Sequence, residues 1–255
     1  MIARLALAAL LVLPGLSRGE DRGRTFHRAL DAFEAARRPE EFAEAARLFE
    51  AVLEGGYENG AVCYDLGNAW YRAGQYGRAI AAYRQALRHL PRDGYVRANL
   101  EAAQAAAAAS AAEPAPAWWQ RVLFWHAELA QRERLWLSAA CWTLVFALAL
   151  ARLVLKTPER PRPALRAGLV AAAAVALVCS ASAALGQLDE SVPRGVVVAE
   201  AAARKGDGET YEPAFDKPLK EGSEFVVLET RGAWIQIRLP GVGDGWVPSR
   251  SVVTY

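Results

Sequence analysis

Two long stretches without a charged residue constrain the fold of this chain more than any other feature. They are residues 135–151, with 17 positions, and residues 167–188, with 22. A helix needs about 20 apolar residues to cross a bilayer, and the arginine that follows the first stretch can snorkel. We therefore predict transmembrane helices over 135–155 and 167–188. A pair of buried core helices is the alternative, which the charged flanks and the short connection over 156–166 disfavour.

The distribution of charge predicts the orientation of these helices. Residues 152–166 carry five basic residues and one acidic residue, whereas residues 20–134 carry 15 basic and 16 acidic residues and residues 189–255 carry eight basic and 11 acidic residues. Short loops rich in Lys and Arg remain in the cytoplasm. We expect a cytoplasmic loop at 156–166, with both large segments on the outer side of the membrane.

The first 19 residues have the pattern of a secretory signal peptide. Arg4 gives a positive start, residues 5–13 are apolar but too short to span a bilayer, and Ser17 and Gly19 supply small residues before a cleavage site. Cleavage after Gly19 is expected, and an uncleaved anchor is the alternative. The leader directs the next segment to the side that the charge distribution also indicates.

A repeat pattern fills the first large segment, residues 20–105. Residues 60–93 span 34 positions, the period of the tetratricopeptide repeat. The diagnostic positions of this unit are small, aromatic or helix-ending residues: Leu66, Gly67, Trp70, Ala79, Tyr83, Ala86 and Pro91. One period earlier, Ala45, Phe49 and Val52 match the second helix, and Phe33 stands where Gly67 does. GYVRANLEAAQ resembles the first helix of a third unit, so we predict an all-α helical repeat.

First helices of such repeats line a concave surface. This geometry predicts that Tyr64, Asn68, Tyr71 and Arg72 face a partner-binding groove, with Arg37 and Arg38 nearby. The alternative is that the two tyrosines only pack against neighbouring helices.

Two short segments connect the repeat to the first apolar stretch. Residues 106–117 are rich in Ala and Pro and are expected to be a semi-rigid linker. Residues 118–134 place Trp118, Val122, Trp125 and Leu129 on one helical face. Such a face next to a membrane span predicts an interfacial aromatic helix, and an aromatic ligand site is the alternative.

The C-terminal segment, residues 190–255, has short β patterns separated by glycine-containing turns. The order of LKEG, GAWIQIRL and GWVPSRSV resembles the bacterial SH3-like domain, which implies a small all-β barrel. Aromatic grooves in that family bind peptides or cell-wall stems, so Tyr211, Trp234 and Trp246 form the expected ligand face. The alternative is that the tryptophans complete the core, which is favoured for Trp246.

No arrangement of residues indicates catalysis. His27, His89 and His126 are scattered, and no glycine-rich loop follows a strand and opens a helix. Cys63 occupies a packing position of the repeat. We therefore expect a protein without enzymatic activity, metal, cofactor or small-molecule substrate. The formal net charge of +2 also argues against a nucleic-acid partner.

The order of these modules resembles the BatE family of bacterial aerotolerance operons, and GYENGAVCYDLGNAWYRAGQYGRAI carries the resemblance most directly. The resemblance implies a scaffold that works beside von Willebrand factor A-type membrane proteins and a MoxR-type ATPase. The alternative function is a cell-wall-sensing receptor whose SH3-like domain binds peptidoglycan. Both hypotheses give the periplasmic repeats a protein partner.

Overall fold

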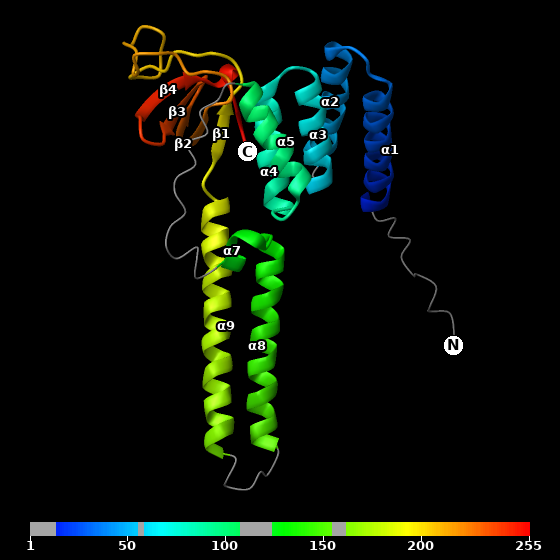
Figure 1. Cartoon of the computed structure of the whole chain (residues 1–255), viewed down its shortest axis with the longest axis vertical. Helices are drawn as coiled ribbons and strands as arrows, with labels where there is room; N and C mark the ends of the chain where they lie inside the picture. The colour runs from blue at the N-terminus through cyan, green and yellow to red at the C-terminus, as the bar shows by residue number, and fades with distance from the viewer. Residues whose placement is uncertain (1–13, 56–58, 108–123, 155–161) are drawn as a thin grey trace, which may run out of the picture.

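A helical repeat and a small β-sheet lie side by side at one end of the molecule, and a long helical hairpin extends away from them (Figure 1). The computed structural model describes residues 14–55, 59–107, 124–154 and 162–255. The residues 1–13 of the predicted signal peptide lie outside this range, and the predicted cleavage point after Gly19 falls within the first helix.

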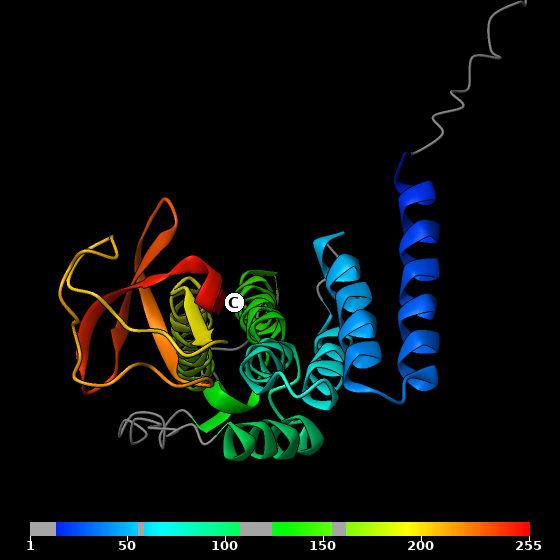
Figure 2. The same ribbon diagram turned by 90° about the horizontal axis from the view of Figure 1, so that it is seen from above.

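The repeat region is a series of antiparallel helices that begins at the right of Figure 1 and ends next to the sheet. The helices are α1 (Pro14–Ala35), α2 (Pro39–Glu54), α3 (Gly60–Arg72), α4 (Tyr76–His89) and α5 (Gly94–Ala106). Seen from above, α1 stands at one end of the series and the sheet at the other (Figure 2).

Local signals in the sequence start and end these helices. The Asn59 side chain accepts a hydrogen bond from the Ala61 N–H at the start of α3, and Asp93 accepts from two N–H groups at the start of α5. Such caps satisfy amide groups that have no partner within the helix. Gly74, with φ of 73°, forms the turn between α3 and α4 in a conformation that favours glycine.

Small and aromatic residues together hold adjacent helices at close range. Gly67 and Tyr83 lie in contact, because a Cβ atom at Gly67 would be 2.4 Å from the Tyr83 ring. Trp70 is 2 % exposed, and its Nε1 donates to Glu50 of α2 at 3.2 Å. The Trp70 side chain thereby links the α3–α4 pair to α2. Cys63 is fully buried in the same core.

Two helices are long and apolar enough to cross a membrane: α8 (Gln131–Val154) and α9 (Arg162–Glu190). They pack as an antiparallel pair through small polar groups. Ser138 Oγ lies 2.8 Å from Ser180 Oγ, and Trp142 Nε1 donates to the same Ser180 oxygen at 3.0 Å. Their outward faces carry exposed apolar side chains such as Trp136 and Leu153.

The aromatic segment before α8 differs from the predicted single helix over 118–134. In its described part, α7 (Phe124–Glu128) ends and α8 begins after two intervening residues. The physical reason is a capping interaction, since Glu133 accepts a hydrogen bond from the Ala130 N–H at 2.9 Å and so defines a new helix start. Residues 118–123 of the predicted aromatic helix lie outside the described residues, and so do residues 108–117 of the predicted linker.

The C-terminal segment forms an antiparallel sheet. Its strands are β1 (Arg194–Val197), β2 (Glu224–Arg231), β3 (Trp234–Leu239), β4 (Gly243–Pro248) and β5 (Val252–Thr254), in the spatial order β4-β3-β2-β1-β5. One face is covered by apolar side chains, among them Val197, Phe225, Ile235, Ile237 and Val247. The short turn η1 (Ser249–Ser251) connects β4 to β5.

The sheet packs directly on the repeat, a contact that joins segments more than 100 residues apart. Val196 of β1 belongs to the same buried cluster as the repeat core, and Val253 and Tyr255 pack against that cluster. Gly77 of α4 approaches β1 so closely that a Cβ atom there would lie 2.5 Å from the Val197 carbonyl oxygen. The repeat and the sheet therefore form one packed unit.

Polar groups complete this contact. Arg84 of α4 forms two hydrogen bonds with Glu224 of β2, from Nε at 2.8 Å and from Nη2 at 2.9 Å. Gln104 of α5 donates to the same carboxylate at 2.9 Å. The Arg88 guanidinium lies 5.3 Å from the centroid of the Tyr255 ring. Because two helices of the repeat hold one carboxylate of the sheet, the sheet has a defined position on the repeat.

Candidate functional site

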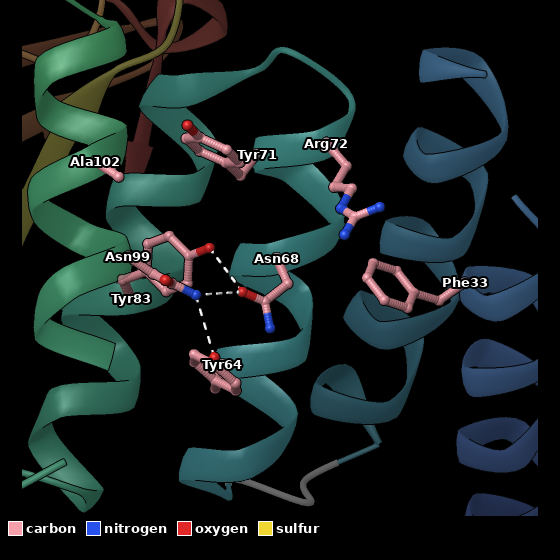
Figure 3. Close-up of a pocket in the computed structure, with 8 residues that line it drawn as sticks. All are labelled: Phe33, Tyr64, Asn68, Tyr71, Arg72, Tyr83, Asn99 and Ala102. Carbon is pink, nitrogen blue, oxygen red and sulfur yellow. Dashed lines mark hydrogen bonds between the residues drawn. The ribbon is translucent and has the colours of Figure 1, made fainter. Parts of the chain in front are cut away.

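A hollow with a volume of about 450 Å³ lies on the repeat, between α1, α3 and α5 (Figure 3). Aromatic, amide and basic side chains line it: Phe33, Tyr64, Asn68, Tyr71, Arg72, Tyr83, Asn99 and Ala102. Half of these residues come from α3. The central helix of the series therefore supplies more of the lining residues than any other helix.

A hydrogen-bond network fixes the floor of the hollow. Asn68 Oδ1 accepts from the Tyr83 hydroxyl at 2.9 Å and from Asn99 Nδ2 at 2.8 Å, and Asn99 Nδ2 also donates to the Tyr64 hydroxyl at 3.1 Å. Burial raises the pKa of Tyr83, so its hydroxyl keeps the proton that it donates. The network holds both amide groups in one orientation, with the Asn68 nitrogen directed away from the bonded atoms (Figure 3).

The rim of the hollow is basic and aromatic. Arg72 ends α3, and its guanidinium lies 5.5 Å from the centroid of the Phe42 ring. Tyr71 is 37 % exposed and meets Tyr76 in an edge-on contact, with ring centroids 5.5 Å apart. A cation beside apolar rings can hold an anionic group and an apolar group of one ligand at the same time.

The structure brings the four residues predicted for the groove together in this hollow. Tyr64 also packs against a neighbouring helix, as the alternative prediction for the tyrosines stated. Its ring centroid lies 6.1 Å from that of Tyr83, and its hydroxyl accepts a hydrogen bond from Asn99. Asn99 and Ala102 on α5 were not predicted from the sequence. One 34-residue step from Asn68 reaches Ala102, so the repeat period contained a signal for that position.

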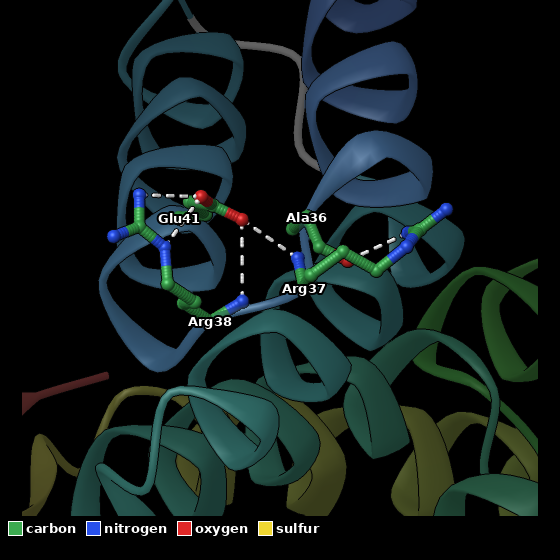
Figure 4. A network of polar contacts seen from close by, with 4 residues as sticks. All are labelled: Ala36, Arg37, Arg38 and Glu41. Atoms are coloured by element: carbon green, nitrogen blue, oxygen red, sulfur yellow. Dashed lines mark hydrogen bonds and ion pairs between the residues drawn. The ribbon is translucent and has the colours of Figure 1, made fainter.

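Arg37 and Arg38, predicted near the groove, instead stabilise the turn between α1 and α2 (Figure 4). Arg38 forms an ion pair with Glu41 at 2.7 Å, and the Arg37 N–H donates to the same carboxylate at 2.7 Å. The Arg37 guanidinium donates to the carbonyl oxygens of Glu34 and Ala36. These hydrogen bonds, first from the Arg37 N–H and then from the Arg38 side chain, lower the pKa of Glu41 to about 2.

The three residues predicted for a ligand face on the sheet have different surroundings. Tyr211 is 50 % exposed, and its ring lies against Gly206. Trp234 is partly exposed at the start of β3, opposite Pro248. Trp246 is only 7 % exposed, because the Arg231 guanidinium lies 5.0 Å from its ring centroid and its backbone pairs with Arg204.

Trp246 is therefore buried, but away from the main core of the sheet. It pairs with Gln236 of β3, whereas the neighbouring residues Ile235, Ile237 and Val247 belong to the apolar cluster on the other face. Successive side chains of a strand point to opposite faces. The ring of Trp246 is thus covered by the protein itself, although it lies outside the apolar cluster of the core in which the sequence favoured placing it.

Among the described residues, no group of three or more His, Cys, Asp or Glu side chains is placed to hold a metal ion. The hollow on the repeat contains no carboxylate among its lining residues. Its chemistry is that of a surface for recognition, with amide donors and acceptors between aromatic rings.

Comparison with known proteins identifies the repeat that builds the hollow. Residues 60–93, which contain α3 and α4, match the tetratricopeptide repeat family. A search of curated proteins gave no match for the chain. The match confirms the predicted repeat unit, and tetratricopeptide repeats generally mediate contacts between proteins. The chain therefore contains a tetratricopeptide repeat, which indicates a role in protein–protein interaction.

Proposed function

We propose that this protein is a non-catalytic, membrane-anchored scaffold that binds a partner protein in the hollow of its tetratricopeptide repeats. The observation that carries the proposal is the hollow itself, formed by side chains from helices of the matched repeat and its two neighbours. Its floor is held rigid by the network of Asn68, Asn99 and Tyr83, which lowers the entropy cost of binding.

The lining favours an extended peptide segment of the partner. The Asn68 Nδ2 group supplies hydrogen-bond donors and the Asn99 carbonyl supplies an acceptor, and a peptide backbone offers both complementary groups. The faces of Tyr71 and Phe33 suit apolar side chains. Arg72 at the rim suits an acidic side chain or a terminal carboxylate. We infer that the bound segment is extended, partly apolar and acidic near Arg72.

We further propose that α8 and α9 span the bacterial inner membrane, with the repeat and the sheet both in the periplasm. The basic connection between the helices supports this orientation through the positive-inside rule. The packing of Val196 and Tyr255 against the repeat core supports it independently, because segments in contact must lie on one side of the membrane. A secretory signal peptide at residues 1–19 is part of the same proposal.

The partners that we propose are von Willebrand factor A-type membrane proteins and a MoxR-type ATPase, on the basis of the resemblance to the BatE family. The sheet is then an SH3-like structural module that supports the repeat. The alternative receptor function needs an aromatic ligand face on the sheet. Burial of Trp246 reduces that face to Tyr211 and Trp234, which favours the scaffold.

Binding to the full-length chain in lipid nanodiscs tests the proposal. Purified von Willebrand factor A-type membrane proteins, the class that the resemblance implies, are titrated against wild type, Asn68→Ala and Arg72→Ala. We expect both variants to lose about tenfold or more in affinity, the effect of about 1.4 kcal/mol. Arg47→Ala, an exposed arginine on α2 outside the hollow, is the control and is expected to bind normally.

Equal binding by all four proteins would show that the hollow is not the binding site. Sedimentation of the same nanodiscs with purified peptidoglycan examines the alternative. Peptidoglycan binding that Tyr211→Ala removes and Arg72→Ala leaves intact would favour the receptor over the scaffold.

A further inference from the structure

The α4–α5 turn, by which we mean residues 90–93 and the first two residues of α5, lies beside the outer end of the helical hairpin (Figure 1). Arg92 Nη2 is 2.7 Å from Glu133 Oε1, and Glu133 is the third residue of α8. Arg97 of α5 lies 4.0 Å from Glu128, the last residue of α7. Two ion pairs thus hold this turn at the level at which the apolar part of α8 begins.

The same turn exposes a large aromatic side chain. Tyr95 is 78 % exposed, the highest value among the large apolar and aromatic side chains described outside α8 and α9. Its backbone N–H is fixed by Asp93, which leaves the ring to project from the first turn of α5. A single exposed ring is common on protein surfaces, so the position of Tyr95 relative to α8 carries the argument.

The depth of Glu133 defines that position. Residue 135 begins the 17 uncharged positions of the first apolar stretch, so Glu133 stands at the boundary between hydrocarbon and headgroups when α8 spans a bilayer. Tyr95 is three residues from Arg92, which is within about 10 Å along the chain. The headgroup layer on each side of the hydrocarbon is about 5–8 Å thick, so Tyr95 is within its reach.

We propose that the α4–α5 turn is a membrane-contact element, with the Tyr95 ring in the phospholipid headgroup layer. Tyrosine suits this position because its ring is apolar and its hydroxyl remains hydrated. The ion pair of Arg92 with Glu133 keeps this segment beside the start of α8. The contact sets the distance of the repeat, and hence of its hollow, from the membrane. This inference rests on the proposed insertion of α8 and α9.

Photo-crosslinking of the protein to lipids tests the proposal. Tyr95 is replaced by p-benzoylphenylalanine in the full chain, which is reconstituted into liposomes of radiolabelled phosphatidylethanolamine and phosphatidylglycerol. Two further chains carry the same group at Phe146, which is 67 % exposed on α8, and at Glu40, at the start of α2. The turn between α1 and α2 is at the end of the repeat away from the hairpin (Figure 1).

We expect irradiation to transfer lipid label to positions 95 and 146 but not to position 40. Label at position 146 without label at position 95 would overturn the membrane contact while supporting insertion of α8. Absence of label at position 146 would instead overturn the proposed insertion, and the contact with it. Equal label at positions 40 and 95 would also overturn the proposal, because the turn would then have no particular proximity to lipid.

Discussion

Gly67 is a point of close contact between α3 and α4, and no larger residue fits there without movement. A Cβ atom would lie 2.4 Å from the Tyr83 ring, a side chain that is itself 1 % exposed and hydrogen-bonded to Asn68. Any shift of Tyr83 therefore disturbs the floor of the hollow as well as the core. Packing and the candidate site are coupled through this one pair of residues.

Gly67→Ala is expected to destabilise the protein by about 1–3 kcal/mol, the usual cost of overpacking a core. Chemical unfolding of the full chain in detergent, followed by circular dichroism, measures the effect. Gly94→Ala is the matched control, since nothing lies within 4 Å of a Cβ atom at that position on α5. Gly94→Ala is expected to leave the free energy of unfolding unchanged or slightly raised. If Gly67→Ala left it unchanged as well, the close contact at Gly67 would be contradicted.

The lowered pKa of Glu41 predicts that the protein becomes less stable at acid pH. Its folded-state pKa of about 2 is below the ordinary value of 4.5, so the carboxylate stabilises the α1–α2 turn above that ordinary value. The contribution is lost as the pH falls from 4.5 towards 2, because the group becomes protonated in both states below its folded pKa. Glu41→Gln should melt lower than wild type near neutral pH and converge with it near pH 2, as measured by thermal melts across this range.

At the scale of elements, the contact between α4 and the sheet decides how the two ends of the chain combine. Gly77, Arg84 and Arg88 are spaced by seven and four residues, which places them on one face of α4. That face meets β1, β2 and the C-terminal Tyr255. The third repeat has only its first helix, α5, in the described residues, and the sheet covers the open side of α4. A terminal repeat needs such a cover for its apolar surface.

The ion pair of Arg84 and Glu224 is expected to contribute measurably to stability. Both side chains are mostly buried, with 23 % and 28 % exposed, and their geometry is bidentate. A double-mutant cycle of Arg84→Ala and Glu224→Ala in the full chain should give a coupling energy within about 0.5–3 kcal/mol. The exposed pair of Lys205 and Glu212 is the control, for which such a cycle should give a coupling energy close to zero. Equal couplings would mean that the sheet is not held at this site.

For the whole molecule, the packed repeat and sheet constrain the topology of the hairpin between them. The chain leaves the repeat, passes through α8 and α9, and returns to contact α4, so both ends of the hairpin lie on the side of the repeat and the sheet (Figure 1). An odd number of membrane crossings between the two is incompatible with this contact. The hairpin also presents apolar side chains on its outer faces, as a lipid environment requires.

Reporter fusions test the topology. Fusions after residues 113 and 255 should be active only with a reporter that functions after export, and a fusion after residue 157 only with a cytoplasmic reporter. The physical reason is the proposed orientation, in which the positive-inside rule places the basic connection in the cytoplasm. Cytoplasmic activity of the fusion after residue 255 would contradict both the orientation and the contact between sheet and repeat.

The sequence by itself determined the elements whose signals are local. The 34-residue period located the repeat at residues 60–93, and uncharged length located both apolar helices. It also selected Tyr64, Asn68, Tyr71 and Arg72, because one helical face follows from spacing alone. Tertiary structure decided the rest. Asn99 reaches the hollow, Trp246 lies under Arg231, and Arg84 meets Glu224 only because the fold brings distant segments together. Such contacts depend on packing between elements, which periodicity along the chain does not encode.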